Sequence, residues 1–452
     1  MELRDKNILI LGLAISGVST AKALSKLGSK ITVTDMKSEN ELAEQLLELK
    51  EINIDYVLGS NDVDLDKIDL IVKSPGIPLD VPIIKKAQER GIEVVTDIEL
   101  AYRITKNKFI AITGTNGKTT TTALTGELIK KAGFNCQITG NIGVGILWKS
   151  VNAENDDIFV IEASSFQLES TRYFKPYISV ITNITPDHLN WHKTFDNYVN
   201  SKKKVFINQK DSDYTILNYD DLLLREMGKE VKSNLIYFSA NNELEKGVYV
   251  DDYQIVINDG TNIINVMDYR ELKIPGRHNL ENALAVVSIG WAMGIDVQII
   301  ANALKEFEGV EHRIEFVDSI GGVSFYNDSK GTNPDASIKA IEAIKEPIIL
   351  IAGGMDKGAD FEEFIDSFNN KVKALVLLGE TKEKIKDTAI SKGFNNIYIV
   401  NSIEEAVVKS FQLADPNDNV LLSPACASWD MFKSYEERGR IFKEAVKKLR
   451  ED

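Results

Sequence analysis

The sequence predicts an α/β protein made of three domains, and three observations support that prediction. The chain has 452 residues, which is the length of about three domains at ~150 residues each. Apolar strand patterns alternate with helix patterns throughout, which is typical of parallel sheets covered by helices on both faces. The pattern restarts at 109–112 and again at 348–354. We therefore expect domains at 1–97, 98–309 and 310–452.

The individual elements follow from the same alternation. In the first domain we expect a helix from about 19 to 27, and strands at 7–11, 31–34, 68–72 and 92–95. In the last domain the apolar runs lie at 348–354, 374–379 and 419–422. Residues 214–275 are more β-like, with a strand at 255–257 before an Asn-Asp-Gly turn, so we expect a mixed central sheet.

Composition and charge exclude several classes of function. The formal net charge is −15, which argues against a nucleic-acid or membrane-surface partner because phosphate backbones require basic faces. The two cysteines, Cys136 and Cys426, are too few for a disulfide framework or a cysteine-based zinc site. No signal peptide and no apolar run near 18 residues is present. We expect a soluble, cytoplasmic protein that works as a monomer.

A small-residue turn, Gly-Leu-Ala-Ile-Ser-Gly at 12–17, follows the first strand. It resembles the Rossmann dinucleotide fingerprint, except that Ala14 replaces the glycine that lets a pyrophosphate approach the backbone. Asp35 ends the next strand, where an acid would bind a ribose hydroxyl. The loop at 73–78 leaves a later strand at the same sheet edge. A Rossmann-like domain that holds NAD or the diphosphate of a UDP-sugar fits these features, and so does a tightly packed turn without a ligand.

The central domain opens with Thr-Gly-Thr-Asn-Gly-Lys-Thr-Thr at 113–120. Backbone N–H groups of such a turn and the start of a helix form a cradle for phosphates. Lys118 would reach the terminal phosphates and the Thr119 hydroxyl would bind Mg²⁺. Ile112 stands where the strict pattern has a glycine, and a plain strand-to-helix turn remains the alternative. We expect a P-loop-type domain whose nucleotide site comprises Gly114, Thr115, Asn116, Gly117, Lys118, Thr119 and Thr120.

Two further side chains are expected at the same sheet edge. Glu162 ends a buried strand at 158–162, where a carboxylate is the usual second partner of Mg²⁺. His188 follows the strand that begins at Val180, and we expect it to contact Mg²⁺ or substrate. A solvated strand end and a structural histidine are the alternatives. His192 is expected at the surface.

Nine motifs in order make the chain resemble the Mur ligase family of peptidoglycan synthesis. They lie at 113–120, 140–143, 162–168, 185–189, 275–282, 311–315, 327–333, 353–361 and 422–430. Within the family, Ser-Ser-Phe-Gln-Leu and Ser-Pro-Ala-Cys-Ala-Ser resemble the member that adds D-glutamate more than its siblings. The resemblance implies two Rossmann-like terminal domains, the first for a UDP-linked substrate and the last for D-glutamate.

The resemblance also implies a reaction. The family forms an acyl phosphate from ATP and the carboxylate of UDP-N-acetylmuramoyl-L-alanine, and the amine of D-glutamate then displaces phosphate, with ADP as the other product. Lys118, Glu162, His188 and Lys202 would be catalytic, and Thr119, Glu162, His188 and Lys202 would bind metal. A carbamylated lysine in the family bridges to a second Mg²⁺. The residues alone select none of the lysines at 202–204, but the family's Tyr-x-x-x-Lys spacing from Tyr198 implies Lys202.

The remaining site residues are implied by the family's motifs. Nucleotide contacts would come from Asn282, Arg313, Asp328 and Lys330. D-glutamate would be held by Thr332, Lys357, Ser428 and Tyr435, although the family usually has phenylalanine at the last position. The UDP-linked substrate would contact Ile15, Ser16, Asp35, Met36, Gly76 and Asn141. Because these residues come from different domains, we expect the C-terminal domain to close over the central one.

Three other functions remain open from the sequence. One is a sibling amide ligase or a folylpolyglutamate synthetase, although the folate enzyme lacks a UDP-binding domain before the phosphate loop. Another is a nucleotide-binding regulator without catalysis, for which metal ligands would be superfluous. The third is an NAD-dependent dehydrogenase, suggested only by the N-terminal turn.

Overall fold

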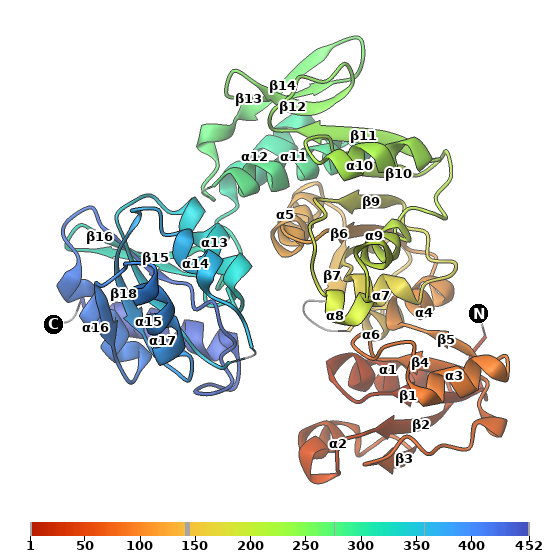
Figure 1. The fold of residues 1–452 in the computed structure, drawn as a ribbon. Coiled ribbons are helices and arrows are strands. Elements are labelled where there is room, and N and C mark those ends of the chain that lie inside the picture. Colours follow the sequence, from red (N-terminus) through yellow and green to blue (C-terminus); the bar gives the residue numbers. More distant parts are fainter. Residues whose placement is uncertain (1, 141–144, 275, 357, 451–452) are drawn as a thin grey trace. The chain divides into compact units, whose positions relative to one another are not determined.

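The computed structural model describes residues 2–140, 145–274, 276–356 and 358–450, and the chain forms two compact units (Figure 1). Unit 1 comprises Met1–Leu272 and Leu280–Glu306, and unit 2 comprises Lys273–Asn279 and Phe307–Asp452. Unit 1 contains two separate sheets and unit 2 contains a third. The boundaries expected at 97 and 309 stay predictions.

The first sheet is fully parallel and has the order β3-β2-β1-β4-β5. Its strands are β1 (Asn7–Leu11), β2 (Lys30–Asp35), β3 (Ile54–Leu58), β4 (Leu70–Lys73) and β5 (Glu93–Val95). Its helices are α1 (Ile15–Lys26), α2 (Ala43–Leu49), α3 (Pro82–Glu89) and α4 (Asp97–Ile104). The strand order reverses between β1 and β4, and Rossmann-like sheets bind ligands in the crevice beyond such a point.

Helix α1 begins at Ile15, four residues before the expected start, so that part of the prediction is wrong. The turn at 12–17 is therefore partly helical. Gly17 permits this because a Cβ there would lie 2.1 Å from the Gly12 carbonyl oxygen. The backbone of the first helical turn thus packs directly against the end of β1.

The second sheet has nine strands in the order β14-β13-β12-β11-β10-β9-β6-β8-β7, and it is mixed as expected. The strands from β7 to β12 pair in parallel, whereas β12, β13 and β14 form antiparallel pairs. The strands are β6 (Lys108–Thr113), β7 (Cys136–Gly140), β8 (Ile158–Glu162), β9 (Ile178–Ile181), β10 (Tyr214–Asn218), β11 (Asn234–Ser239), β12 (Gly247–Asp251), β13 (Gln254–Asn258) and β14 (Ile263–Asp268). The helices are α5 (Lys118–Lys131), α6 (Ile146–Ser150), α7 (Ser165–Glu169), α8 (Leu189–His192), α9 (Phe195–Lys203), α10 (Leu222–Met227), α11 (Arg277–Ala292) and α12 (Val297–Glu306).

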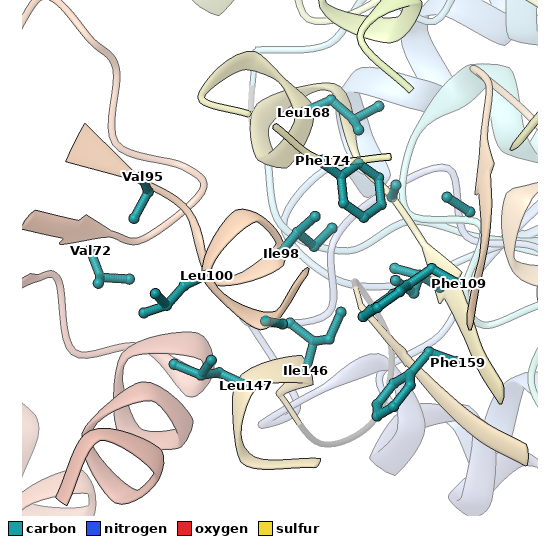
Figure 2. Packing of buried hydrophobic residues seen from close by; sticks show 14 of the residues in the cluster. Val72, Val95, Ile98, Leu100, Phe109, Ile146, Leu147, Phe159, Leu168 and Phe174 are labelled. Carbon is teal, nitrogen blue, oxygen red and sulfur yellow. The ribbon is translucent and has the colours of Figure 1, made fainter. Parts of the chain in front are cut away.

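One hydrophobic core joins the two sheets of unit 1 (Figure 2). Helix α6 contacts α1 and α4 as well as β7. Side chains of β4 and β5, including Val72 and Val95, belong to the same cluster as Phe109 and Phe159, whose stacked rings are 5.2 Å apart. Burial of this much apolar surface is the main stabilising contribution. The UDP-binding domain and the phosphate-loop domain of the prediction therefore share a core.

Unit 2 contains a sheet with the order β15-β16-β20-β17-β18-β19, parallel except for the β15–β16 pair. The strands are β15 (Glu315–Ile320), β16 (Val323–Asn327), β17 (Ile348–Ala352), β18 (Val372–Leu377), β19 (Ile397–Ile399) and β20 (Asn419–Leu422). The helices are α13 (Pro334–Ala343), α14 (Glu362–Asp366), α15 (Lys382–Ser391), α16 (Ile403–Leu413) and α17 (Tyr435–Lys448). Successive residues of β17 belong alternately to two core clusters, so both faces of this sheet are covered. Within the described ranges, no helix has the length and apolarity that a membrane crossing requires.

Candidate functional site

The phosphate loop lies between β6 and α5, at the carboxyl edge of the parallel part of the nine-stranded sheet. Strand pairing places Ile112 opposite Glu162 and Thr113 opposite Ile181. Two glycines shape the loop: Gly114 has φ 145°, and Gly117 has φ 83° and caps α5. L-residues with side chains rarely adopt such conformations. The start of α5 and the ends of β8 and β9 therefore converge around the loop.

Residues that follow β9 hold the phosphate loop in place. Asn183 accepts hydrogen bonds from the Thr115 N–H through its carbonyl and from the Asn116 N–H through its side chain, both at 2.9 Å. The Thr182 hydroxyl donates to the Asn116 carbonyl at 2.6 Å. A Cβ at Gly114 would lie 2.0 Å from Thr182 Oγ1. The sequence pattern alone does not indicate this role of Thr182 and Asn183.

Two lysines converge on one carbonyl of this loop. Lys118 Nζ donates to the Gly114 carbonyl at 2.9 Å and to the Thr115 carbonyl at 2.7 Å, and Lys202 Nζ donates to Gly114 at 2.6 Å. Lys202 is 1% exposed. Burial, reinforced by the Lys118 charge, holds the pKa of Lys202 well below its usual value, while Asp187 opposes the shift.

The neighbouring lysines have a different environment. Lys203 forms an ion pair with Glu230 at 2.6 Å, and Lys204 donates to the Glu169 carbonyl. Both side chains are partly exposed, whereas Lys202 is on the buried face of α9 with Tyr198. Burial therefore distinguishes Lys202 within the lysine run, which the residues alone could not do.

The predicted metal ligands lie around the same loop. Glu162 is 3% exposed at the end of β8, and Thr119 is 6% exposed in the first turn of α5. His188 has φ 53°, and its Nε2 lies 3.4 Å from Asp187 Oδ2. Burial, together with the charges of Lys118 and Lys202, lowers the pKa of His188, although Asp187 raises it. The imidazole is thus mainly neutral near pH 7 and can offer a ring nitrogen to a cation.

The oxygen atoms of Glu162 and Thr119 suit a partly hydrated Mg²⁺ better than a metal ion whose ligands all come from the protein. In the described part of the chain, no three His, Cys, Asp or Glu side chains form a group that could hold a metal ion. Mg²⁺ usually keeps several waters and takes one or two carboxylates together with substrate phosphates. Glu162 and the Thr119 hydroxyl supply oxygen atoms of that kind beside the phosphate loop.

His192 is buried, so the expectation of a surface residue is wrong. It is 3% exposed, with Nε2 2.9 Å from Ser165 Oγ and Nδ1 3.3 Å from Ser201 Oγ. Its ring stacks on Phe166 with centroids 5.5 Å apart. Burial lowers the pKa of His192 to about 4. The neutral ring connects α7, α8 and α9, the segments adjacent to Glu162, His188 and Lys202.

The described residues of the predicted UDP pocket lie at or just beyond the carboxyl ends of β1, β2 and β4. Asp35 accepts the Leu13 N–H at 2.7 Å and the Lys37 N–H at 2.9 Å, so its carboxylate shapes the turn after β1. Ile15 is 77% exposed and Met36 67%, and a planar base could cover such side chains. A hydrogen bond links Ser16 to the buried carboxyl of Asp97.

Unit 2 carries its own group of predicted site residues. Asp328 is buried after β16 and accepts the Ser423 hydroxyl at 2.7 Å, and burial raises its pKa to about 6. Among the described residues, the buried Nε of Arg313 has no hydrogen-bond partner, which leaves a donor for an anion. Lys330 Nζ lies 5.6 Å from the ring of Tyr435, the first residue of α17.

The other predicted residues have separate positions. Ser428 is buried and Thr332 is half-buried, both in unit 2. Asn282 belongs to unit 1 and accepts the Thr121 hydroxyl at 3.1 Å. The predictions for Asn141 and Lys357 lie outside the described residues.

Family models cover most of the chain. The Mur ligase MurD-like N-terminal domain matches residues 6–96, the Mur ligase middle domain matches 112–290, and the Mur ligase glutamate ligase domain matches 312–426. These matches, together with the three sheets, confirm the three-domain α/β class.

Comparison with individual proteins agrees with the family models. UDP-N-acetylmuramoylalanine--D-glutamate ligase of Thermoanaerobacter sp. (strain X514) is 51% identical over 100% of both chains, and the protein of that name from Clostridioides difficile (strain 630) is 46% identical over 100% of both. In fold, the chain is similar to the UDP-N-acetylmuramate-alanine ligase MurC of Thermotoga maritima, with 20% identity, a TM-score of 0.62 and coverage of 98% and 99%. MurF of Thermotoga maritima gives 15% identity, a TM-score of 0.60 and 99% coverage of both. The chain belongs to the Mur ligase family.

Proposed function

We propose that this chain is an ATP-dependent ligase that joins D-glutamate to UDP-N-acetylmuramoyl-L-alanine during peptidoglycan precursor synthesis. The observation that carries the proposal is the 51% identity, over the whole of both chains, to a relative named for that ligation. The converging Lys118 and Lys202 at a phosphate loop support it, because a carboxylate must be activated before an amide can form. Consumption of ATP and a UDP-linked precursor fits a cytoplasmic enzyme, and we propose a monomer.

The first step is phosphoryl transfer to the substrate carboxylate. A carboxylate oxygen attacks the γ-phosphorus of ATP, the bond to the ADP oxygen breaks, and an acyl phosphate forms. Negative charge spreads over the transferred group, so catalysis depends on positioning and on positive groups around it. Lys118 and the N–H groups at the start of α5 supply those groups in the proposed mechanism.

The second step is amide formation. The uncharged amine of D-glutamate attacks the acyl carbon, phosphate leaves with the electron pair of the carbon–oxygen bond, and the amine loses a proton. Lys330, Thr332 and Ser428 are proposed to orient D-glutamate and the nucleotide in unit 2. Arg313 would donate to a phosphate oxygen through its buried guanidinium nitrogen.

Metal binding is proposed at Thr119, Glu162 and His188. When bound there, Mg²⁺ would neutralise charge on the phosphate oxygens. The lowered pKa of Lys202 supports the further proposal that its amine is carbamylated. Only a neutral amine adds to carbon dioxide: a nitrogen–carbon bond forms as a carbon–oxygen π bond opens, a proton passes to solvent, and the neutral amine becomes a carbamate anion. Its oxygens could then bind a second Mg²⁺, which prefers oxygen ligands.

Amino-acid dependence of phosphate release tests the proposed function. Purified protein is given ATP, Mg²⁺, UDP-N-acetylmuramoyl-L-alanine and one amino acid at a time. We expect phosphate release only when D-glutamate is the amino acid supplied, and a Lys118→Met variant should be inactive. Release that depends instead on L-alanine, with UDP-N-acetylmuramate as acceptor, would assign the chain to a sibling activity.

A further inference from the structure

Lys73, at the end of β4, is a buried cation to which no role has been assigned above. It is 1% exposed. Its ammonium donates to the carbonyls of Ile77 at 2.9 Å, Pro75 at 3.1 Å and Ser74 at 3.5 Å. The loop at 74–77 therefore folds around the Lys73 ammonium.

Trp191, from the central domain, contacts the same loop. Its indole N–H donates to the Gly76 carbonyl at 3.0 Å, and its ring centroid lies 5.8 Å from Lys73 Nζ. Lys73 and Trp191 together use the carbonyls of all four residues at 74–77. Trp191 belongs to α8, which begins directly after His188.

The loop is also connected to the turn after β1. The Ser74 hydroxyl donates to the Gly12 carbonyl at 3.0 Å. Hydrogen bonds thus run from the turn at 12–17, through the loop at 74–77, to α8. The first two of these segments carry predicted UDP-pocket residues, and His188 immediately precedes the third.

Burying a lysine ammonium carries a desolvation penalty that packing alone does not explain. Burial lowers the pKa of Lys73 to about 8, and the carboxylates of Asp97 and Glu169 partly offset that shift. An apolar side chain in a buried strand would avoid the desolvation penalty. Since the ammonium points its hydrogens at loop carbonyls, its evident effect is to fix the backbone of that loop.

We propose that Lys73 and Trp191 are positioning residues, which fasten the UDP-pocket loop at 74–77 to α8. The link sets how far the carboxylate of a UDP-anchored substrate reaches toward the phosphate loop and His188. This inference rests on the proposed function. It assigns to the pair an effect on substrates held by their uridine end, and none on substrates without that anchor.

The test compares a full acceptor with a shortened one. Trp191→Phe removes the N–H donor and keeps an aromatic ring. With UDP-N-acetylmuramoyl-L-alanine we expect kcat/KM to fall about five-fold, the effect of losing one hydrogen bond, while KM for ATP stays within two-fold. With N-acetylmuramoyl-L-alanine 1-phosphate, which lacks uridine, the variant should match the unmodified protein.

Controls separate positioning from general damage. Trp148→Phe is the matched control, because Trp148 also lies beside a lysine, with Lys26 Nζ 5.9 Å from its ring centroid. This variant should leave kcat/KM unchanged with both acceptors. Lys73→Met should reproduce the acceptor-specific loss, and Trp191→Phe keeps the test valid if Lys73→Met does not fold.

Two results would overturn the inference: an unchanged kcat/KM for the full acceptor in Trp191→Phe, or an equal loss with both acceptors. Calorimetric binding of the UDP-linked acceptor alone distinguishes this failure from failure of the proposed function. If the unmodified protein binds that acceptor without ligating D-glutamate, Trp191→Phe should still weaken binding about five-fold.

Discussion

Replacing Gly114 by alanine tests whether the loop after β9 fixes the phosphate loop. The new Cβ would lie 2.0 Å from Thr182 Oγ1 and 3.2 Å from the Asn183 carbonyl oxygen. Gly114 also has φ 145°, where side chains are rarely tolerated. Relieving the overlap requires the two loops to separate by about 1 Å, or the Thr182 hydroxyl to rotate away and lose its 2.6 Å hydrogen bond to the Asn116 carbonyl, because Cβ contacts closer than 3.0 Å essentially do not occur.

The expected loss of stability in Gly114→Ala can be worked out by comparison with a control glycine. Gly133, after α5, has φ 84°, and a Cβ there would meet nothing within 4 Å. Gly133→Ala should therefore lower the free energy of unfolding by about 1 kcal/mol, which is the penalty of placing a side chain on left-handed backbone. Gly114→Ala adds the loss of the two hydrogen bonds that Asn183 accepts from the Thr115 and Asn116 N–H groups, at about 1 kcal/mol each. We expect Gly114→Ala to be at least about 2 kcal/mol less stable than Gly133→Ala, and to bind ATP at least about ten-fold more weakly.

Urea unfolding and calorimetric titration with ATP measure both quantities. Adding Thr182→Ala should relieve the overlap, so the double variant should lose about 1–2 kcal/mol less than the sum of the single variants. Thr182→Val keeps an atom at the Oγ1 position and should give no relief. A Gly114→Ala variant as stable as Gly133→Ala, or one that binds ATP within two-fold of the unmodified protein, would show that the loop after β9 does not fix the phosphate loop.

Three further predictions concern the same edge of the sheet. Lys202→Met should lower kcat at least about 100-fold by removing the proposed carbamate ligand of the second Mg²⁺, whereas Lys203→Met should keep the rate of phosphate release within two-fold; equal effects would refute the distinction. Glu162→Gln should raise the Mg²⁺ concentration for half-maximal rate about ten-fold, because a carboxylate is the stronger ligand, and an unchanged Mg²⁺ titration would contradict its role. Burial lowers the pKa of His192 to about 4, whereas its ordinary value is near 6.5. Between these two pH values the unfolded chain binds a proton at His192 and the folded chain does not, so the free energy of unfolding falls as pH falls. His192→Gln has no titrating group at this position. From pH 7.5 to 5.5 its free energy of unfolding should therefore rise by about 1 kcal/mol relative to that of the unmodified protein. If the difference in free energy of unfolding between the two proteins does not change with pH, His192 is not held neutral.

Much of the fold could be predicted because continuous apolar runs mark buried parallel strands. The runs at 158–162 and 419–422 coincide with β8 and β20. The predicted start of helix α1 is too late, because the first turn of the helix consists of small and apolar residues that are also typical of a loop. Only the close approach of Gly17 to the Gly12 carbonyl shows that a helix can begin there.

The site could be predicted less completely. Polar residues at strand ends identify Lys118 and Glu162, since parallel strands end at one edge. A run of three lysines does not show which one faces inward, and that depends on the packing of α9 against the loop. His192 is misjudged for the same reason: its burial depends on Phe166, Ser165 and Ser201, which α7 and α9 place against its ring.

Lys73 carries a signal in the sequence itself. It ends the run Leu-Ile-Val-Lys, a buried strand, so its side chain had to lie in or beside the core. A lysine in that position calls for carbonyl or carboxylate partners. Which partners it finds depends on the backbone of the following loop and on Trp191, and neither can be read from spacing.

Oxygen transfer from the acceptor carboxylate to phosphate tests the central claim most directly. The purified protein is incubated with ATP, Mg²⁺, D-glutamate and UDP-N-acetylmuramoyl-L-alanine labelled with ¹⁸O in both carboxylate oxygens. Mass spectrometry then measures the ¹⁸O content of the phosphate and of the amide product. An acyl phosphate predicts one ¹⁸O in each released phosphate and one ¹⁸O retained in an amide with D-glutamate. Unlabelled phosphate, or phosphate released without the D-glutamate adduct, would contradict the account.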